Sequence, residues 1–291
     1  MADLTSDAEL ALGSTVEGSE ASRRVGILRR ALRDPALVLS CLVIVVVALW
    51  ALMPGLFTGT DPLEVGVGGS FEAPSLSHPF GTDQLGRDLL SRTIYGTSET
   101  AKATLSAVLL GLVVGTTLGV LSGLARGLVD AVIMRLIAVL LAIPGLLLAM
   151  AVVAALGYGT INIAIAVGIS AVAPFARVMR AEVIRVASMD YISASYGSGA
   201  GFLRTAWHHV VPNAAPTVLA LAALECGAAL LAVASLGFLG YGAPPPQPEW
   251  GLAVAEGRNY LSLYPWVSLL PGLVIIVVVV ATNRISKSVS R

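Results

Sequence analysis

The sequence predicts an all-α protein that crosses a lipid membrane with six helices. Hydrophobic residues make up 56% of the 291 residues and charged residues only 12%, with a mean hydropathy of +0.84. A water-soluble chain carries roughly 25% charged residues. The apolar residues form long runs, and Lys and Arg are unevenly divided between the segments that separate them. The net charge is zero, so nothing indicates a nucleic-acid partner.

The N-terminal segment, residues 1–35, is predicted to be a disordered cytoplasmic tail that ends in a basic flank. Its first 22 residues are rich in Asp, Glu, Ser and Gly and lack periodicity. Five arginines follow, and then an apolar run over 36–53. This run is about 18 residues long, more than the 7–15 of a secretory signal core, and no Ala-x-Ala cleavage site follows it. We therefore expect it to be the first membrane span.

The remaining spans follow from length and hydropathy. A hydrocarbon core of about 30 Å needs roughly 20 helical residues. Five further runs satisfy this requirement: 102–124, 133–156, 161–180, 214–237 and 266–283. They divide the chain into an outer loop over 54–101, a membrane core over 102–283 and a C-terminal tail over 284–291.

The distribution of positive charge predicts the orientation. If the N-terminus is cytoplasmic, 14 of the 18 Lys and Arg residues lie in inner segments. The remaining four are Arg87, Arg92, Lys102 and Arg258. This asymmetry follows the positive-inside rule. We expect both termini to be cytoplasmic, with 54–101, 157–160 and 238–265 outside.

The second span contains a glycine every four residues: Gly111, Gly115, Gly119 and Gly123. This spacing places them on one helix face, where a neighbouring backbone can approach closely because there is no Cβ. The stripe is consistent with static tight packing or with a helix that slides during function.

Several kinds of chemistry are excluded by pattern. The sequence has no G-x-x-x-x-G-K-[ST] run, so we expect no nucleotide site in this chain. The glycines of 197–201 follow a membrane helix rather than a strand, which argues against a dinucleotide site. His208 and His209 are adjacent and diverge by about 100° on a helix. Cys41 and Cys226 lie in apolar runs, which favours free side chains. We expect no catalytic residue, metal site or cofactor here.

Glu225, within 214–237, is the single clear acid inside a predicted span. A charge in lipid is costly, so this residue is a functional candidate. Its possible roles are binding a substrate amine, carrying a proton or hydrogen-bonding to a neighbouring subunit. A structural role as a protonated or paired glutamate is equally consistent with the sequence.

A long cytoplasmic segment, 182–212, separates the fourth and fifth spans. An amphipathic pattern is followed by Asp190, which is suited to cap a short helix. Glycines then break the pattern, and Phe202 to Val211 is predicted to form another helix that ends before Pro212. Such a helix–turn–helix with a small-residue centre predicts a docking element, with an exposed Tyr or Trp as an anchor.

The same loop carries a recognisable spacing. Ser193-Ala194-Ser195 precedes Gly199, and His209-Val210-Val211-Pro212 comes after nine intervening residues. This pattern resembles the cytoplasmic "EAA" motif of ABC importer permeases, with Ser193 in place of its Glu and Ser195 in place of its second Ala. The resemblance implies that 182–212 is a coupling-helix loop. Its ATPase-docking residues would be Ser193, Ala194, Ser195, Gly199, His209, Val211 and Pro212.

Two outer blocks narrow the resemblance to the oligopeptide, dipeptide and nickel permeases, and most to their C-type subunit. The first runs from His78 to Gly96, and the second includes Ala234–Gly240 with Glu249-Trp250-Gly251. The outer signature residues are Gly81, Thr82, Asp83, Gly86, Arg87 and Asp88. The family often has an acid where Val233 stands; Glu225, two turns earlier, is a candidate to replace it.

The resemblance implies a type I ABC importer permease fold in a bacterial cell membrane. The partners would be a second permease subunit, two subunits that bind ATP and Mg, and an extracytoplasmic peptide-binding protein. The cargo would be oligopeptides or dipeptides, with a nickel chelate or another small solute as the alternative. A self-sufficient secondary transporter is the competing class. It would show inverted repeats and several intramembrane charges.

Overall fold

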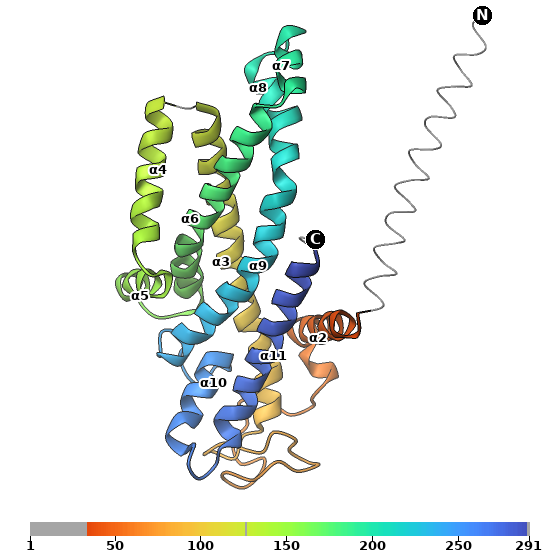
Figure 1. Cartoon of the computed structure of the whole chain (residues 1–291). Helices are drawn as coiled ribbons and strands as arrows, with labels where there is room; N and C mark the ends of the chain where they lie inside the picture. The colour runs from red at the N-terminus through yellow and green to blue at the C-terminus, as the bar shows by residue number, and fades with distance from the viewer. Residues whose placement is uncertain (1–33, 126, 290–291) are drawn as a thin grey trace, which may run out of the picture.

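The computed structural model describes residues 34–125 and 127–289, so residues 1–33 of the tail predicted over 1–35 lie outside this part (Figure 1). Helices dominate it. In chain order these are α2 (Pro35–Leu52), η1 (Pro54–Leu56), α3 (Leu89–Ala125), α4 (Gly127–Ala142), α5 (Gly145–Leu156), α6 (Thr160–Ala187), α7 (Asp190–Gly197), α8 (Phe202–Thr205), the π-turn η2 (Ala206–Val210), α9 (Val211–Phe238), α10 (Trp250–Gly257), η3 (Arg258–Tyr260) and α11 (Trp266–Val289).

Five of these helical segments are long and apolar enough to cross a membrane. They are α2, α3, α6, the continuous run Phe202–Phe238 and α11. The bent pair α4 and α5 raises the number to six if it counts as one span. The all-helical membrane fold expected from composition is therefore confirmed for the described residues.

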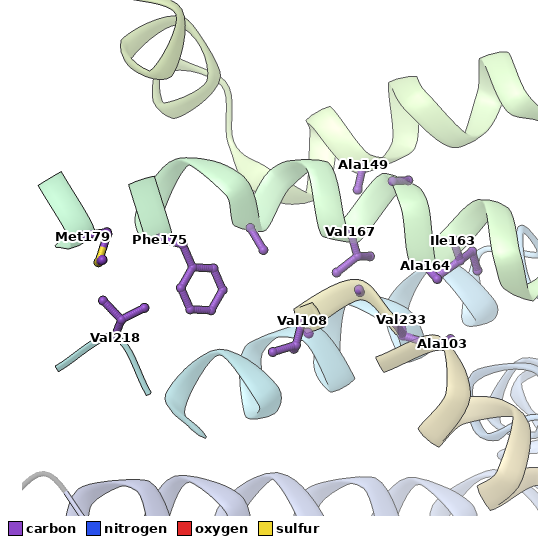
Figure 2. Close-up of a cluster of buried hydrophobic side chains, with 14 of the residues drawn as sticks. Ala103, Val108, Ala149, Ile163, Ala164, Val167, Phe175, Met179, Val218 and Val233 are labelled. Carbon is purple, nitrogen blue, oxygen red and sulfur yellow. The ribbon is translucent and has the colours of Figure 1, made fainter. Parts of the chain in front are cut away.

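The centre of the molecule is formed by α3, α6 and α9, with α5 against α6 (Figure 1). Figure 2 shows how Val108 of α3, Phe175 of α6 and Val218 of α9 meet in one buried cluster. Large leucine and valine side chains cover the outside of the same helices. Apolar side chains both inside the bundle and on its surface are expected for helices whose outer faces contact lipid or another membrane chain.

The first helix follows the sequence expectation of 36–53 closely. Asp34 caps it by accepting hydrogen bonds from the backbone N–H groups of Ala36 and Leu37, at 3.1 and 3.3 Å. Pro35 occupies the first turn, where its missing N–H costs nothing. The helix stops at Leu52, just before the Met53-Pro54 pair.

The second helix begins earlier than predicted. The expected boundary at 102 lies inside α3, which starts at Leu89 because Asp88 accepts a hydrogen bond from the Ser91 N–H at 2.7 Å. Residues 89–101 of the predicted outer loop are therefore helical. With 37 residues, α3 is about 55 Å long and extends beyond a hydrocarbon core of about 30 Å.

The span predicted over 133–156 is broken in the structure. The two helices α4 and α5 meet at an angle of 95°. Pro144 lies at the break, with ψ of 127°. Proline disfavours a helical residue before it and cannot donate a backbone hydrogen bond, so the helix ends at Ala142 and restarts at Gly145.

Two other predicted helix ends are too early. α6 passes through Pro174 and continues to Ala187 rather than ending at 180. α11 runs to Val289, so most of the tail predicted over 284–291 is helical. Arg284, on this extension, pairs with Asp34 at 2.7 Å and so joins the start of α2 to the end of α11.

Candidate functional site

The predicted docking loop forms a small helical hairpin at one end of the bundle, remote from the outer loop (Figure 1). It comprises α7, the turn through Gly199, and α8, between the long helices α6 and α9. Asp190 is the first residue of α7. The hairpin therefore lies on two extended helices that reach the centre of the molecule.

The hairpin is anchored by buried side chains on both of its arms. Ile192 is buried in the same cluster as Val186 of α6 and Val210 of the π-turn. Thr205 is fully buried, and its hydroxyl lies 3.3 Å from the Ser195 hydroxyl across the hairpin. These contacts make the hairpin a continuation of α6 and α9, not a freely hinged loop.

Gly199 forms the turn of the hairpin. Its φ of +86° lies in the left-handed region that glycine adopts without strain, and a Cβ there would meet nothing within 4 Å. The Ala200 N–H donates to the Ser195 carbonyl at 3.1 Å, which closes the turn after α7. The glycine is therefore needed for its backbone conformation, and the space around it is open.

The hairpin exposes large apolar side chains beside polar ones such as Asp190 and Arg204. Leu203 is 71% exposed, and Tyr191 and Phe202 are also exposed. Trp207 is exposed as well, but it lies beyond α8 on the π-turn and lines a groove with residues of α3 and α9. Ser193 and Ala194 lie on the exposed face of α7. Contiguous exposed apolar side chains mark contact surfaces with other molecules.

The far end of the motif differs from expectation. The helix predicted over Phe202–Val211 does not stop before Pro212 but continues to Phe238. The π-turn over Ala206–Val210 explains this, because its wider turn accommodates a proline ring and a missing N–H within a continuous helix. His209 and Pro212 are exposed and Val211 is half-buried. They lie in the π-turn and the first turn of α9, which follow the hairpin.

The outer signature residues fold into a compact, buried loop structure at the other end of the molecule. Gly81 and Gly86 have φ of +74° and +70°. A Cβ on either would collide with the carbonyl oxygen of Glu72 or Gly68, so these glycines allow a close approach of backbone to backbone. Thr82 accepts from the Glu72 N–H at 2.8 Å and donates to the Gly69 carbonyl at 2.6 Å.

Four charged side chains form an ion-pair cluster within this loop structure and its neighbouring helices. Asp83 accepts from Arg87 Nε at 2.6 Å, and Glu256 accepts from Arg92 Nη2 at 2.9 Å. Arg87 also lies 3.5 Å from Glu256. Arg92 is 2% exposed and donates through Nη1 to the carbonyls of Pro62 and Pro246 at 3.3 and 3.4 Å. The cluster joins the outer loop, α3 and α10.

Asp88 completes the signature with two roles. One carboxylate oxygen caps α3, and the other lies 3.0 Å from Nδ1 of His78. All six signature residues thus belong to one folded unit, the outer module, named for its predicted side of the membrane: residues 57–88, the first turns of α3, and α10. The sequence did not identify Glu256, whose role depends on Arg92, 164 positions earlier in the chain.

The Glu249-Trp250-Gly251 block supports this module from the side. Trp250 is buried and donates through Nε1 to the Thr93 carbonyl at 2.9 Å. Glu249 accepts from the backbone N–H groups of Gly251 and Leu252 at 2.9 and 2.8 Å and so caps α10. Burial raises the pKa of the Glu249 carboxyl above its ordinary value, although these two donors oppose the shift.

The glycine stripe of α3 faces α6 along its whole length. An added Cβ would meet residues of α6 at a constant offset of 60 positions: Gly111 with Ala171, Gly115 with Phe175, Gly119 with Met179 and Gly123 with Val183. A constant offset requires the two helices to run in the same direction. The Gly115 Cβ would lie 2.6 Å from the Val172 carbonyl oxygen, which is backbone and cannot move aside.

Glu225 lies half-buried on α9. Within the described chain, it has no hydrogen bond or ion pair. Gly227, two residues on, lies against Asn283 of α11. The described residues also include no group of three His, Cys, Asp or Glu side chains placed to hold a metal ion. Cys41 and Cys226 are free.

Comparison with known proteins identifies the family. Residues 115–291 match the family model for the binding-protein-dependent transport system inner membrane component. The di/tripeptide transport system permease protein DppC of Pseudomonas aeruginosa (strain UCBPP-PA14) is 44% identical over 203 residues, covering 70% of this chain and 67% of the relative. The glutathione transport system permease protein GsiD of Escherichia coli O1:K1 is 39% identical over 210 residues, covering 72% and 69%.

The fold is shared with solved transporters. A chain of the MetNI methionine ABC transporter in an inward-facing conformation superimposes with a TM-score of 0.56 at 18% identity. The match covers 70% of this chain and 98% of that chain. The chain therefore belongs to the family of binding-protein-dependent transport system inner membrane components, and it is a multi-pass permease subunit of an ABC importer, not an enzyme.

Proposed function

We propose that this chain is one of two permease subunits of an importer of short peptides, coupled by its α7–α8 hairpin to ATP-hydrolysing partners. The relatives named above support the substrate class, because di- and tripeptides and glutathione are all short peptide-like solutes. The remaining partners are a second permease and a peptide-binding protein outside the membrane. ATP and Mg belong to two ATPase subunits.

The observation that carries the docking role is the hairpin that is anchored by buried side chains and exposes large apolar ones. Ile192 and Thr205 hold it to α6 and α9, while Tyr191, Phe202 and Leu203 remain exposed. A partner that grips this surface moves both long helices together. Because α6 contacts the glycine face of α3, the displacement passes directly to the centre of the bundle.

The transport cycle then follows from differential binding. ATP closes the ATPase pair and moves the hairpins, and the spans of the two permeases rock so that the cavity between them opens outward to receive peptide. A ligand shifts such an equilibrium only through different affinities for the two states. ATP on the inside and the loaded binding protein on the outside supply that difference.

The orientation proposed for this cycle places both termini and the α7–α8 hairpin in the cytoplasm of a bacterial cell. The count of 14 inner Lys and Arg residues supports it. Two of the four outer cations, Arg87 and Arg92, are buried in ion pairs, so they do not oppose this orientation as free charges.

Substitutions at Gly199 test the coupling role. Gly199→Leu adds a bulky side chain at a left-handed position, at a backbone cost of about 1–2 kcal/mol. We expect peptide uptake to fall at least about 10-fold, which corresponds to about 1.4 kcal/mol. Capture of peptide by the binding protein and the amount of chain in the membrane should be unchanged.

Two further variants separate bulk from backbone strain. Gly199→Asn adds a side chain that tolerates the left-handed conformation, and Gly197→Ala adds a methyl group where nothing lies within 4 Å. The first should impair uptake less than Gly199→Leu, and the second should leave it normal. Normal uptake by Gly199→Leu would contradict the role of the hairpin as a lever.

A further inference from the structure

A groove between α4 and α6 is not used by the proposed coupling mechanism. It has a volume of about 540 Å³ and is lined by five apolar residues of α4, Met134, Ile137, Ala138, Leu141 and Ala142, and by Arg177 and Arg180 of α6. α4 lies at the edge of the bundle, away from α2 and α11 (Figure 1). The groove therefore opens on the periphery of the molecule.

The charges at this groove are unbalanced. Arg180 is already paired, because it donates from Nε and Nη2 to the two carboxylate oxygens of Asp130, each at 2.6 Å. Asp130 also accepts from Ser122, so its acceptors are engaged. Arg177 is exposed and makes no hydrogen bond or ion pair within residues 34–125 and 127–289. Arg135 is not a lining residue, but it adjoins Met134 at the rim of the groove, and it is exposed and equally unpaired within that part.

The two free arginines lie at the same height. The Asp130–Arg180 pair fixes the level of α4 against α6. Ile137 shares a buried cluster with residues 172–176, so the two helices run in opposite directions. Arg135 is five residues beyond Asp130 and Arg177 is three residues before Arg180. At 1.5 Å per residue they differ in height by about 3 Å.

Their depth corresponds to a membrane boundary. α6 begins at Thr160, beside the stacked rings of Tyr158 and Tyr241, and aromatic rings of this kind favour the interface. Arg177 lies about 26 Å along the helix from Thr160. A hydrocarbon core of about 30 Å then places its guanidinium at the opposite headgroup level, on the side that carries most of the Lys and Arg.

We propose that this groove binds an anionic phospholipid, with its phosphate held by Arg135 and Arg177 and an acyl chain along the apolar wall of α4. Guanidinium groups bind phosphate through paired N–H donors, and basic pockets between membrane helices on the cytoplasmic side suit acidic headgroups. The two unpaired cations select for a negative headgroup, and the apolar wall selects for a lipid over free phosphate.

Native mass spectrometry of the detergent-purified transporter complex tests this proposal. The probes are a phosphatidylglycerol and a phosphatidylcholine with identical acyl chains. At about one kcal/mol for each arginine, phosphatidylglycerol should bind about 30-fold more tightly. The double variant Arg135→Gln/Arg177→Gln should lose this preference, and Arg135→Lys/Arg177→Lys should retain most of it.

The control is Arg284→Gln, which removes an exposed arginine paired with Asp34 elsewhere in the molecule. It should leave the preference unchanged. Equal binding of the two lipids, a normal preference in the double glutamine variant, or displacement of the lipid by millimolar glycerol phosphate would each overturn the proposal.

Photo-crosslinking identifies the occupant in the assembled transporter. A p-benzoyl-phenylalanine in place of Ala138 faces the groove, and in membranes it should form an adduct with phospholipid. An adduct with the second permease subunit would overturn the proposal, because that subunit would then cover the groove.

Discussion

At the scale of single residues, the outer module depends on a buried arginine. Arg92 is 2% exposed and pairs with Glu256, which is itself mostly buried. Removing one partner of such a pair leaves the other charge uncompensated and typically costs 3–5 kcal/mol. We therefore expect Arg92→Met to lower the free energy of unfolding by about 3 kcal/mol, measured by denaturation of the complex in detergent.

The matched control is Lys102→Met on the same helix. Lys102 pairs with Glu99 at 2.9 Å, but its side chain is exposed. Exposed pairs contribute about 0–1 kcal/mol. Equal losses from the two variants would contradict the importance of burial at Arg92.

The buried carboxyl of Glu249 should make the stability of the protein depend on pH. Burial raises its pKa above the ordinary value of 4.5, so ionisation is harder in the folded protein than in the unfolded chain. Its contribution to stability is therefore most favourable at low pH and declines as pH rises from 4.5 towards the raised folded pKa. Glu249→Gln removes this dependence but loses one backbone acceptor.

The measurement is the difference in Tm between Glu249→Gln and the unmodified protein, followed from about pH 4 to about pH 8. As pH rises, the Tm of Glu249→Gln should increase relative to the Tm of the unmodified protein. The missing acceptor should lower the Tm of the variant by an amount that does not depend on pH. A difference that is independent of pH would show that Glu249 ionises as easily in the folded protein as in the unfolded chain.

At the scale of helices, the glycine face of α3 should be the most sensitive to added atoms. In Gly115→Ala, the new Cβ would lie 2.6 Å from both the Val172 carbonyl oxygen and the Phe175 Cβ. Forcing extra atoms into a tightly packed contact costs about 1–3 kcal/mol. We expect a loss of that size in the free energy of unfolding.

Gly272→Ala is the comparison within another membrane helix. Its Cβ would meet only Val254 Cγ2 at 3.9 Å, which is ordinary contact. Alanine also favours a helix over glycine by about 1 kcal/mol, so this variant should be neutral or stabilising. Similar losses at both positions would mean that the α3–α6 contact is no tighter than an ordinary one.

Local signals were sufficient for some elements and not for others. Asp34, Pro35 and the Met53-Pro54 pair fix both ends of α2 from within the segment, and its prediction was accurate to one residue. The start of α3 was missed because its first turns contain Ser91 and Arg92. Their polarity is compensated by Thr60 and Glu256, distant in sequence.

The candidate site shows the same division. Asp190 and the glycines of 197–201 predicted a helix–turn–helix, and its turn at Gly199 requires only local backbone geometry. The continuation of the helix through Pro212 depends on the π-turn before it. No residue pattern in the sequence predicted that turn. The 95° bend at Pro144 had a local signal in the proline, but hydropathy alone does not distinguish a straight span from a broken one.

At the scale of the whole molecule, the proposed coupling requires the hairpin and the outer module to lie on opposite sides of the membrane. On a background lacking Cys41 and Cys226, Ser77→Cys and Ser193→Cys provide exposed reporters at the two ends. A membrane-impermeant maleimide should label Ser77→Cys in intact cells and Ser193→Cys only after permeabilisation. Labelling of Ser193→Cys in intact cells would invert the proposed orientation.

The most direct test of the central claim is a photo-crosslink from the hairpin in the assembled transporter. With p-benzoyl-phenylalanine in place of Tyr191, exposed on α7, the account predicts an adduct with an ATPase subunit. The same probe in place of Leu76, exposed in the outer loop, should give none with that subunit. An ATPase adduct from position 76, or its absence from position 191, would contradict the claim that the α7–α8 hairpin couples this permease to ATP hydrolysis.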